Sequence, residues 1–211
     1  MIYLVSNTPF LHEKVINLKV CDIKFKIFNI EKKYDAIIFT SKNAVKALEY
    51  NQIMPSLKTD IYTIGIPTFK AAKNFGFENI YIGRAGTGNA FACEISHLLV
   101  RKKRVLYLKA EKTVSKLNLI LERDGVRLDC IEAYENKFVK ADVSLKPPSS
   151  AVLIFTSPFN VECFVENFGW DESWRAVAIG KTTAQSLEKY CEVAICGKVS
   201  IKDCVQTALK M

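Results

Sequence analysis

Ile37-Ile-Phe-Thr-Ser41 and Leu153-Ile-Phe-Thr-Ser157 are nearly the same five-residue stretch, and they lie in the two halves of a 211-residue chain. In each stretch a short apolar run is followed by Thr-Ser, which is typical of a buried strand leading into the N-cap of a helix. Repeated strand-to-helix units build parallel sheets. The two stretches therefore predict an α/β protein with two similar halves.

Further short apolar runs alternate with amphipathic stretches along the whole chain. The runs predict strands at residues 2–5, 36–40, 61–64, 79–82, 105–108, 152–156, 176–179 and 193–196. Helical periodicity follows most of them, as in the stretches that begin at Asn43 and Thr183. This alternation favours two lobes, each a parallel sheet flanked by helices.

Three more blocks recur in the same order as the Thr-Ser stretches. Ile2-Tyr-Leu4 matches Leu106-Tyr-Leu108, Ile27–Glu31 matches Ile131–Glu135, and Ile64-Gly-x-x-Thr68 matches Ile179-Gly-x-x-Thr183. Such ordered recurrence indicates an internal duplication. Segments at about 22–31 and 128–138 are strand-like, and we expect them to run antiparallel as a two-stranded ladder between the lobes, with a cleft between these lobes.

The amino-acid composition limits the classes of protein to which the chain can belong. With 49% hydrophobic residues the chain has enough apolar side chains for a sizeable core. No apolar run approaches the roughly 20 residues that span a bilayer, and the apolar start Met1–Val5 is too short for a signal peptide. We therefore expect a soluble protein of the cytoplasm.

The chain carries a net charge of +8 and an isoelectric point near 9.1. This charge fits an anionic partner, whether nucleic acid, a phosphate or a polycarboxylate, and does not choose among them. The densest basic run, Arg101-Lys-Lys-Arg104, follows a helix-like stretch at 91–100. We interpret the run as the solvated end of that helix, where cations suit the helix dipole.

Several kinds of chemistry are disfavoured by what the sequence lacks. The seven cysteines form no Cys-x-x-Cys pair and the two histidines have no ligand partners in the pattern, so we predict no metal site. Gly86-Thr-Gly-Asn89 precedes a helix but fits neither a Walker loop nor a dinucleotide fingerprint, so we predict no nucleotide cofactor. The sequence shows no recognisable pattern of a catalytic nucleophile paired with a general base.

Anionic ligands are expected at the carboxyl ends of the strands, where helix N-termini present free backbone N–H groups. The candidate residues there are Ser41 and Ser157, Thr68, Thr182 and Thr183, and Gly88 and Asn89. Two interpretations stay open for them. The serine and threonine hydroxyls cap the helices, or the corners that all these residues form bind carboxylates.

Taken together, three blocks resemble the uroporphyrinogen-III synthase family. They are Phe39-Thr-Ser-Lys-Asn-Ala-Val45, Ile179-Gly-Lys-Thr-Thr-Ala184 and Ala85-Gly-Thr-Gly-Asn89, and the second Thr-Ser block continues to Pro158. Their order and spacing cover nearly the whole chain. The resemblance implies one lobe of residues 1–26 and 138–211, a second lobe of residues 27–137, and substrate-binding roles that include Lys42, Asn43 and Pro158.

The reaction implied by the resemblance closes the linear tetrapyrrole hydroxymethylbilane, with its eight carboxylates, to uroporphyrinogen III. Water is lost and ring D is inverted, without cofactor or metal. Tyr134 matches the tyrosine that the family places in its cleft and is the candidate general acid, while an ordinary packed tyrosine is the alternative. We expect a monomer that receives the bilane from the upstream enzyme, hydroxymethylbilane synthase.

The chain departs from the family pattern at two corners. Ser6-Asn-Thr-Pro9 replaces the usual Thr-Arg-Pro, and Lys109-Ala110 replaces the usual Arg-Gly. Two bidentate guanidinium groups are therefore absent, while Lys109 keeps one positive charge for a substrate carboxylate.

Two other classes of protein remain as alternatives. A two-lobed binding protein would close on an anionic metabolite without turnover. A nucleic-acid module would use the positive charge, but the sequence lacks an aromatic and basic recognition pattern.

Overall fold

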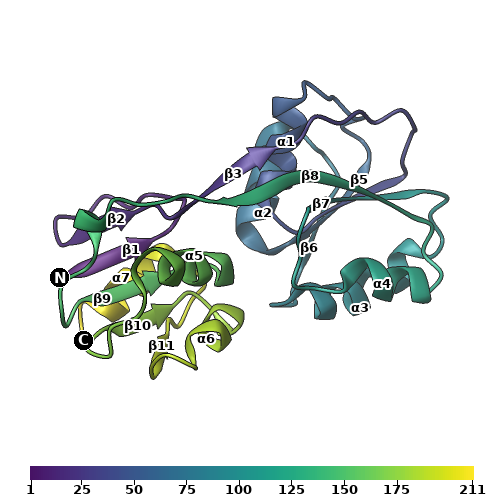
Figure 1. Ribbon diagram of the computed structural model, residues 1–211. Helices are drawn as coiled ribbons and strands as arrows, with labels where there is room; N and C mark the ends of the chain where they lie inside the picture. Colours follow the sequence, from purple (N-terminus) through teal and green to yellow (C-terminus); the bar gives the residue numbers. More distant parts are fainter. The chain divides into compact units, whose positions relative to one another are not determined.

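The computed structural model describes all residues from Met1 to Met211. The chain forms two compact units, the first made of Met1–Asp22 and Lys137–Met211, and the second of Ile23–Asn136. Figure 1 shows that the chain passes from one unit to the other along β3 (Cys21–Phe25) and returns along β8 (Leu128–Phe138). The lobe bounds implied by the resemblance, residues 1–26 with 138–211 and residues 27–137, stay a prediction.

The first unit is built on a five-stranded sheet in which every pair of neighbouring strands is parallel. Its strands are β1 (Ile2–Val5), β2 (Val15–Leu18), β9 (Val152–Phe155), β10 (Arg175–Ala178) and β11 (Val193–Ile195), and its helices are α5 (Pro158–Phe168), α6 (Lys181–Leu187) and α7 (Ile201–Ala208), with a 3-10 turn η1 (Val143–Leu145). Phe164 of α5 and Leu187 of α6 pack on one face, and Cys204 of α7 on the other.

The second unit contains a six-stranded sheet. Its strands are β3, β4 (Ala36–Phe39), β5 (Asp60–Ile64), β6 (Ile80–Gly83), β7 (Val105–Ala110) and β8, and its helices are α1 (Lys42–Tyr50), α2 (Gly65–Phe75), α3 (Gly88–Leu99) and α4 (Leu117–Arg123). Leu48 of α1 packs with Ile37, while Phe91 of α3 packs with Ile38 on the opposite face. Because helices cover both faces, β4 is buried at every residue, as the continuous apolar run predicts.

The order of strands supports the internal duplication. The first sheet runs β11-β10-β9-β1-β2 and the second runs β6-β5-β4-β7-β8, with β3 at its edge. In the first sheet β9, which precedes a Thr-Ser corner, lies next to β1, which carries a Tyr-Leu block. In the second sheet β4 and β7 are neighbours in the same way. Three of the four repeated blocks therefore occupy equivalent places.

The fourth block match is wrong. Residues Ile27–Glu31 lie outside any strand, whereas Ile131–Glu135 lie in β8. The place equivalent to β8 is taken by β2, which the sequence did not indicate. The reason is local: β2 is a four-residue edge strand whose middle residues, Ile16 and Asn17, are exposed, so it lacks a buried apolar run.

The ladder strand predicted at residues 22–31 is shorter than expected, because β3 ends at Phe25. Beyond this point the side chain of Asn51 replaces a strand partner: its Nδ2 donates to the Lys26 carbonyl at 3.0 Å and its Oδ1 accepts from Phe28 N at 3.2 Å. Lys26 N donates to Ala133 O and Val139 N donates to Val20 O, so residue numbers rise on one strand as they fall on the other. This is the pattern of an antiparallel pair, as predicted.

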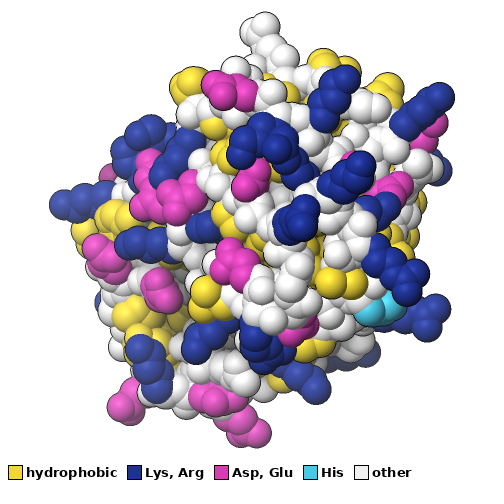
Figure 2. Space-filling model, turned by 90° about the vertical axis from the view of Figure 1, so that its right-hand side faces the viewer, with side chains coloured by type: hydrophobic (Ala, Val, Ile, Leu, Met, Phe, Trp, Pro, Cys, Tyr) yellow, Lys and Arg dark blue, Asp and Glu magenta, His cyan; other side chains and the backbone are white.

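Charged side chains are distributed rather than sorted on the surface seen in Figure 2. Lys and Arg side chains cover much of this face and Asp and Glu side chains stand among them. Arg101, Lys103 and Arg104 are exposed just beyond the end of α3, in agreement with a solvated helix end. None of the helices has the length and apolar character that crossing a membrane requires.

The core of the first unit yields a stability prediction. Phe164 is fully buried and its ring contacts those of Phe155, Phe168, Trp170 and Trp174. We expect Phe164→Ala to lower the free energy of unfolding by about 3–5 kcal/mol. Both tryptophans of the chain lie in this unit, so their fluorescence during urea unfolding reports on it alone.

Leu11→Ala is the matched control, because Leu11 belongs to the same unit and is 95% exposed. It should change the free energy of unfolding by less than about 0.5 kcal/mol. Equal midpoints for the two variants would contradict the assignment of Phe164 to the core.

Candidate functional site

The carboxyl edge of the second sheet places hydroxyl side chains beside a helix N-terminus. β4 ends at Phe39, and Thr40 and Ser41 follow it. Ser41 is the N-cap of α1, and its Oγ accepts a hydrogen bond from Asn43 N at 3.1 Å. The N-cap interpretation of Ser41 is therefore confirmed. Ala44 N donates to the carbonyl of Ser41 at 3.1 Å, and no acidic residue lies in the first turn of α1.

Tyr134 reaches the same edge from β8. Its side chain is 6% exposed, and the side chain of Ser41 lies close enough to its phenol to lower the pKa of that phenol. The two residues are far apart in the sequence, and they meet because β8 lies next to β7 and β7 next to β4. The structure thus brings together the predicted general acid and one predicted substrate-binding residue.

The surroundings of Tyr134 raise the pKa of its phenol. Burial raises its pKa above the usual value of about 10, and the hydrogen bond with Ser41 opposes this rise only in part. A phenol that holds its proton throughout the neutral range is a donor rather than a base. This is the protonation state that a general acid needs.

A second buried tyrosine lies at this edge and was not singled out from the sequence. Tyr107 was predicted as an ordinary strand residue, and it is buried in β7. Its hydroxyl, however, lies 3.0 Å from Thr40 Oγ1 and is also hydrogen-bonded to Ser115, and burial raises its pKa to about 12. The signal available in advance was the polar tip of a tyrosine close to the end of a predicted strand, three residues before β7 ends at Ala110.

The corner at Gly88 and Asn89 is occupied by the chain itself. Asn89 Oδ1 accepts a hydrogen bond from Lys116 N at 2.7 Å, and Gly88 faces Ser115 so closely that a Cβ would come within 2.5 Å of Ser115 Oγ. Thr87 rather than Asn89 caps α3. In this structure the glycine allows the loop before α4 to approach the helix N-terminus.

Lys109 is also engaged within the protein. Its Nζ contacts Glu132 Oε1 at 3.3 Å and donates to the carbonyls of Ala110 and Glu111. Lys42 and Asn43 are partly exposed in the first turn of α1, and burial, followed by the neighbouring charge of Lys46, lowers the pKa of Lys42.

The threonines of the Gly-x-x-Thr blocks are not caps. Ile64 holds the N-cap position of α2 and Gly180 that of α6, neither with a side-chain hydrogen bond. Thr68 and Thr183 are buried inside the first turns of these helices, and Thr182 is partly exposed. The capping interpretation is therefore wrong for these three threonines, because the strand runs directly into the helix through the glycine.

The first unit has its own edge around Ser157, which caps α5 and accepts from Asn160 N at 3.2 Å, with Pro158 as the first helical residue. Asn160 is 3% exposed; its Nδ2 donates to Thr156 Oγ1 at 3.0 Å and its Oδ1 lies 2.9 Å from the Cys21 thiol. The Asn7 side chain, at the position of a family arginine, lies 3.0 Å from the same thiol. Burial raises the pKa of Cys21 to about 11, so it stays a neutral thiol.

Other features of the second unit do not coincide with the predicted residues. A hollow of about 750 Å³ lies at the amino ends of β4 and β5, and its walls include Ile37, Asp60 and Lys102. None of the predicted site residues lines this hollow. No cluster of three or more His, Cys, Asp or Glu side chains is arranged to hold a metal ion.

Comparison with known proteins decides the family. The model of the family described as uroporphyrinogen-III synthase HemD matches residues 18–206. The chain belongs to the uroporphyrinogen-III synthase family. Enzymes of this family cyclise hydroxymethylbilane in tetrapyrrole biosynthesis.

Solved structures agree with this assignment. The crystal structure of uroporphyrinogen-III synthetase from Helicobacter pylori is 29% identical, with a TM-score of 0.81 over 99% of this chain and 98% of that one. A mutant uroporphyrinogen III synthase from Thermus thermophilus is 15% identical, with a TM-score of 0.61 over 93% and 89%, and shows a similar fold. No match was found among curated protein sequences.

The protonation of Tyr134 is open to a direct test. Because its pKa in the folded protein lies above that in the unfolded chain, Tyr134 stabilises the fold below about pH 10, and this contribution is lost as the pH rises through the folded value. We expect the ultraviolet phenolate titration of the native protein, minus that of Tyr134→Phe, to show one phenol ionising above pH 10. A difference titration centred below pH 10 would contradict the effect of burial.

Proposed function

We propose that this chain closes hydroxymethylbilane to uroporphyrinogen III with loss of water and inversion of ring D, and that Tyr134 is its general acid. The observation that carries the proposal is the contact of the buried Tyr134 phenol with Ser41 at the carboxyl edge of a parallel sheet. Ligands of open α/β sheets bind at this kind of edge. Membership of the uroporphyrinogen-III synthase family supplies the reaction.

The chemical step asks little of the protein. The phenol of Tyr134 donates its proton to the departing hydroxyl group, the carbon–oxygen bond breaks with its electron pair, and water leaves an azafulvenium cation beside the Tyr134 phenolate. The substituted α-carbon of ring D then attacks the cationic methylene carbon to form a spiro intermediate. The bond from that α-carbon to the bridge to ring C breaks, the free α-carbon of ring D bonds to the released bridge carbon, and the proton that this α-carbon loses restores the phenol. Without the protein the bilane closes to the non-inverted isomer, so the enzyme acts mainly by holding the substrate in the conformation that permits attack at the crowded position.

Backbone amides are proposed to bind the acetate and propionate groups of the substrate. The first turns of α1, α3, α5 and α6 carry no acidic residue, so the positive ends of their dipoles are not neutralised. The binding residues proposed are Ser41, Lys42, Asn43, Thr68, Gly88, Asn89 and Lys109 in the second unit, and Ser157, Pro158, Thr182 and Thr183 in the first. The net charge of +8 favours approach of an octa-anion.

We further propose that the enzyme works in the cytoplasm as a monomer and takes its substrate from hydroxymethylbilane synthase. The bilane closes spontaneously to the wrong isomer, so a short path between the two enzymes favours the correct product. Mixing the purified enzymes and comparing isomer yields with and without an added trap for free bilane tests this transfer.

The reaction itself is tested by supplying freshly made hydroxymethylbilane to the purified protein, oxidising the product and separating the porphyrin isomers. We expect isomer III in excess over the isomer I that forms spontaneously. Isomer I alone would sink the proposal, and tight binding of the bilane without isomer III would instead identify a binding protein.

Tyr134→Phe tests the general acid. Removing one hydroxyl should lower kcat by about 10²-fold, the lower end of what acid catalysis contributes, and leave KM within about twofold. Tyr81→Phe is a suitable control, because Tyr81 is exposed on β6 and its hydroxyl bonds Glu94. A wild-type kcat for Tyr134→Phe would remove Tyr134 from the mechanism.

The role of the helix N-termini is tested by comparing two variants of α5, one that loses the N-cap side chain and one whose first-turn amides are covered. Ser157→Ala removes one side-chain hydrogen bond and should raise KM by no more than about threefold, whereas Pro158→Trp covers the first-turn amides and should raise KM by at least about tenfold. Equal KM values for the two variants would show that substrate carboxylates do not use this corner.

A further inference from the structure

The pairing of β7 with β8 contains one extra residue beside Tyr134. Lys109 is opposite Glu132, but the next residue of β7, Ala110, is opposite Tyr134, so Ala133 has no opposite residue on β7. In a regular strand successive side chains point to opposite faces of the sheet. Here Ala133 and Tyr134 are adjacent and both buried in the same core cluster. The bulge therefore turns Tyr134 to the face on which Ser41 lies.

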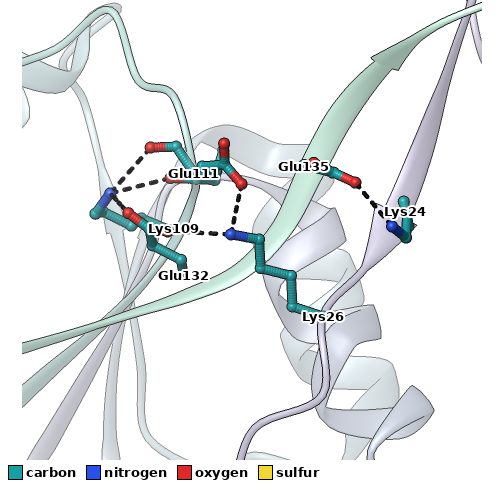
Figure 3. A network of polar contacts seen from close by, with 7 residues as sticks. Lys24, Lys26, Lys109, Glu111, Glu132 and Glu135 are labelled. Atoms are coloured by element: carbon teal, nitrogen blue, oxygen red, sulfur yellow. Dashed lines mark hydrogen bonds and ion pairs between the residues drawn. The ribbon is translucent and has the colours of Figure 1, made fainter.

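Side chains from both neighbouring strands hold the residue that precedes the bulge. Glu132 Oε2 lies 3.1 Å from Lys26 Nζ, just beyond β3, and Glu132 Oε1 lies 3.3 Å from Lys109 Nζ on β7. Figure 3 shows that the carboxylate of Glu132 is placed between the two ammonium groups, with Glu111 as a further partner of Lys26. Glu132 is thus fixed from two sides.

The backbone of the bulge is tied down by the residues that carry these charges. Lys26 N donates to the carbonyl of the extra residue, Ala133, at 3.0 Å. Glu111 N donates to the carbonyl of Tyr134 at 2.8 Å. Lys26 therefore contributes two side-chain contacts to the network and Glu111 one, and each also forms one main-chain bond to the bulge.

We propose that Glu132, held between Lys26 and Lys109, is a positioning residue that fixes the bulge at Ala133 and so aims the Tyr134 phenol at Ser41. The inference rests on the proposed function only in taking Tyr134 as the general acid. The charges persist at neutral pH, because the bonds from Lys26 and Lys109 lower the pKa of Glu132 while those to Glu111 and Glu132 raise the pKa of Lys26.

The competing explanation is a set of solvated ion pairs without consequence. The side chains of Lys26 and Glu132 are 32% and 46% exposed, and an isolated pair of this kind contributes little to stability. A role in positioning must therefore be visible in the catalytic step and in the environment of Tyr134 rather than in the free energy of unfolding.

Glu132→Gln tests the proposal, and Glu135→Gln is its matched control. Glutamine keeps the size of the side chain but cannot accept from both lysines. Glu135 is on the same strand and pairs with Lys24 at 3.3 Å, without contact to Lys26 or Lys109 (Figure 3). We expect Glu132→Gln to lower kcat by about three- to tenfold with KM within about twofold, and Glu135→Gln to leave both unchanged. Equal effects of the two variants would overturn the proposal.

Lys26 provides the conservative rescue. Lys26→Met should lower kcat about as far as Glu132→Gln, whereas Lys26→Arg keeps a cation opposite Glu132 and should stay close to the wild type. If Lys26→Arg were as slow as Lys26→Met, the charge on Lys26 would not be what positions Tyr134.

A double-mutant cycle shows whether Glu132 acts through the phenol. In a Tyr134→Phe background the Glu132→Gln substitution should cause no further loss of kcat, because the group that it positions is gone. A loss that is the same in both backgrounds would mean that Glu132 acts elsewhere, and would overturn the proposal.

A spectroscopic readout separates this inference from the proposed function. The protein contains eight tyrosines, and labelling with 3-fluorotyrosine gives each a fluorine resonance, with that of Tyr134 assigned from Tyr134→Phe. We expect Glu132→Gln to shift the Tyr134 resonance while the remaining resonances stay in place. The control Glu135→Gln should leave the Tyr134 resonance unshifted. An unmoved Tyr134 resonance would refute the positioning role even if Tyr134 proved to be the general acid, and a shifted one would support it even if Tyr134→Phe kept full activity.

Discussion

Parallel pairing of β4 with β7 is the constraint on which the site depends. Parallel strands end at the same edge of a sheet, so the Thr-Ser corner after β4 and the end of β7 come together, and β8, parallel to β7, delivers Tyr134 there. Each strand that runs into a helix also leaves backbone N–H groups without partners. Hydroxyl groups, a helix N-terminus and a phenol therefore gather at this edge as a consequence of topology.

The two halves show how a duplicated unit diverges. The residue three places after the corner serine is Ala44 in the second unit and Asn160 in the first, and both are buried. Asn160 joins Thr156 to the Cys21 thiol, a polar connection with no counterpart at Ala44. The strand beside β1 is the short β2, which carries no tyrosine, whereas the strand beside β7 is the longer β8, with Tyr134. Both units present helix N-termini, while the proposed general acid, Tyr134, lies in the second unit.

The bulge in β8 shows how a single extra residue changes chemistry. Without it, strand alternation would place Ala133 and Tyr134 on opposite faces. With it, the phenol is buried beside Ser41, and this burial raises its pKa further above the neutral range. The bulge thus sets both the direction of the phenol and the rise in its pKa. The lysines and glutamates around Glu132 lie where that geometry is set, at the junction of β7, β8 and the end of β3.

The sequence by itself determined the α/β class, the duplication, the antiparallel ladder, the N-caps at Ser41 and Ser157, and the family. These follow from short-range patterns: apolar runs of strand length, helical periodicity and a serine at a strand-to-helix corner. Only the tertiary structure decided that Ile27–Glu31 is not a strand, that Thr68, Thr182 and Thr183 are not caps, that Asn89 and Lys109 bind the chain itself, and that Tyr107 presents a hydroxyl to Thr40. The physical reason is that each of these outcomes depends on a partner distant in the sequence, such as Asn51 for Lys26 or Glu132 for Lys109, and no local pattern specifies which distant residue will arrive.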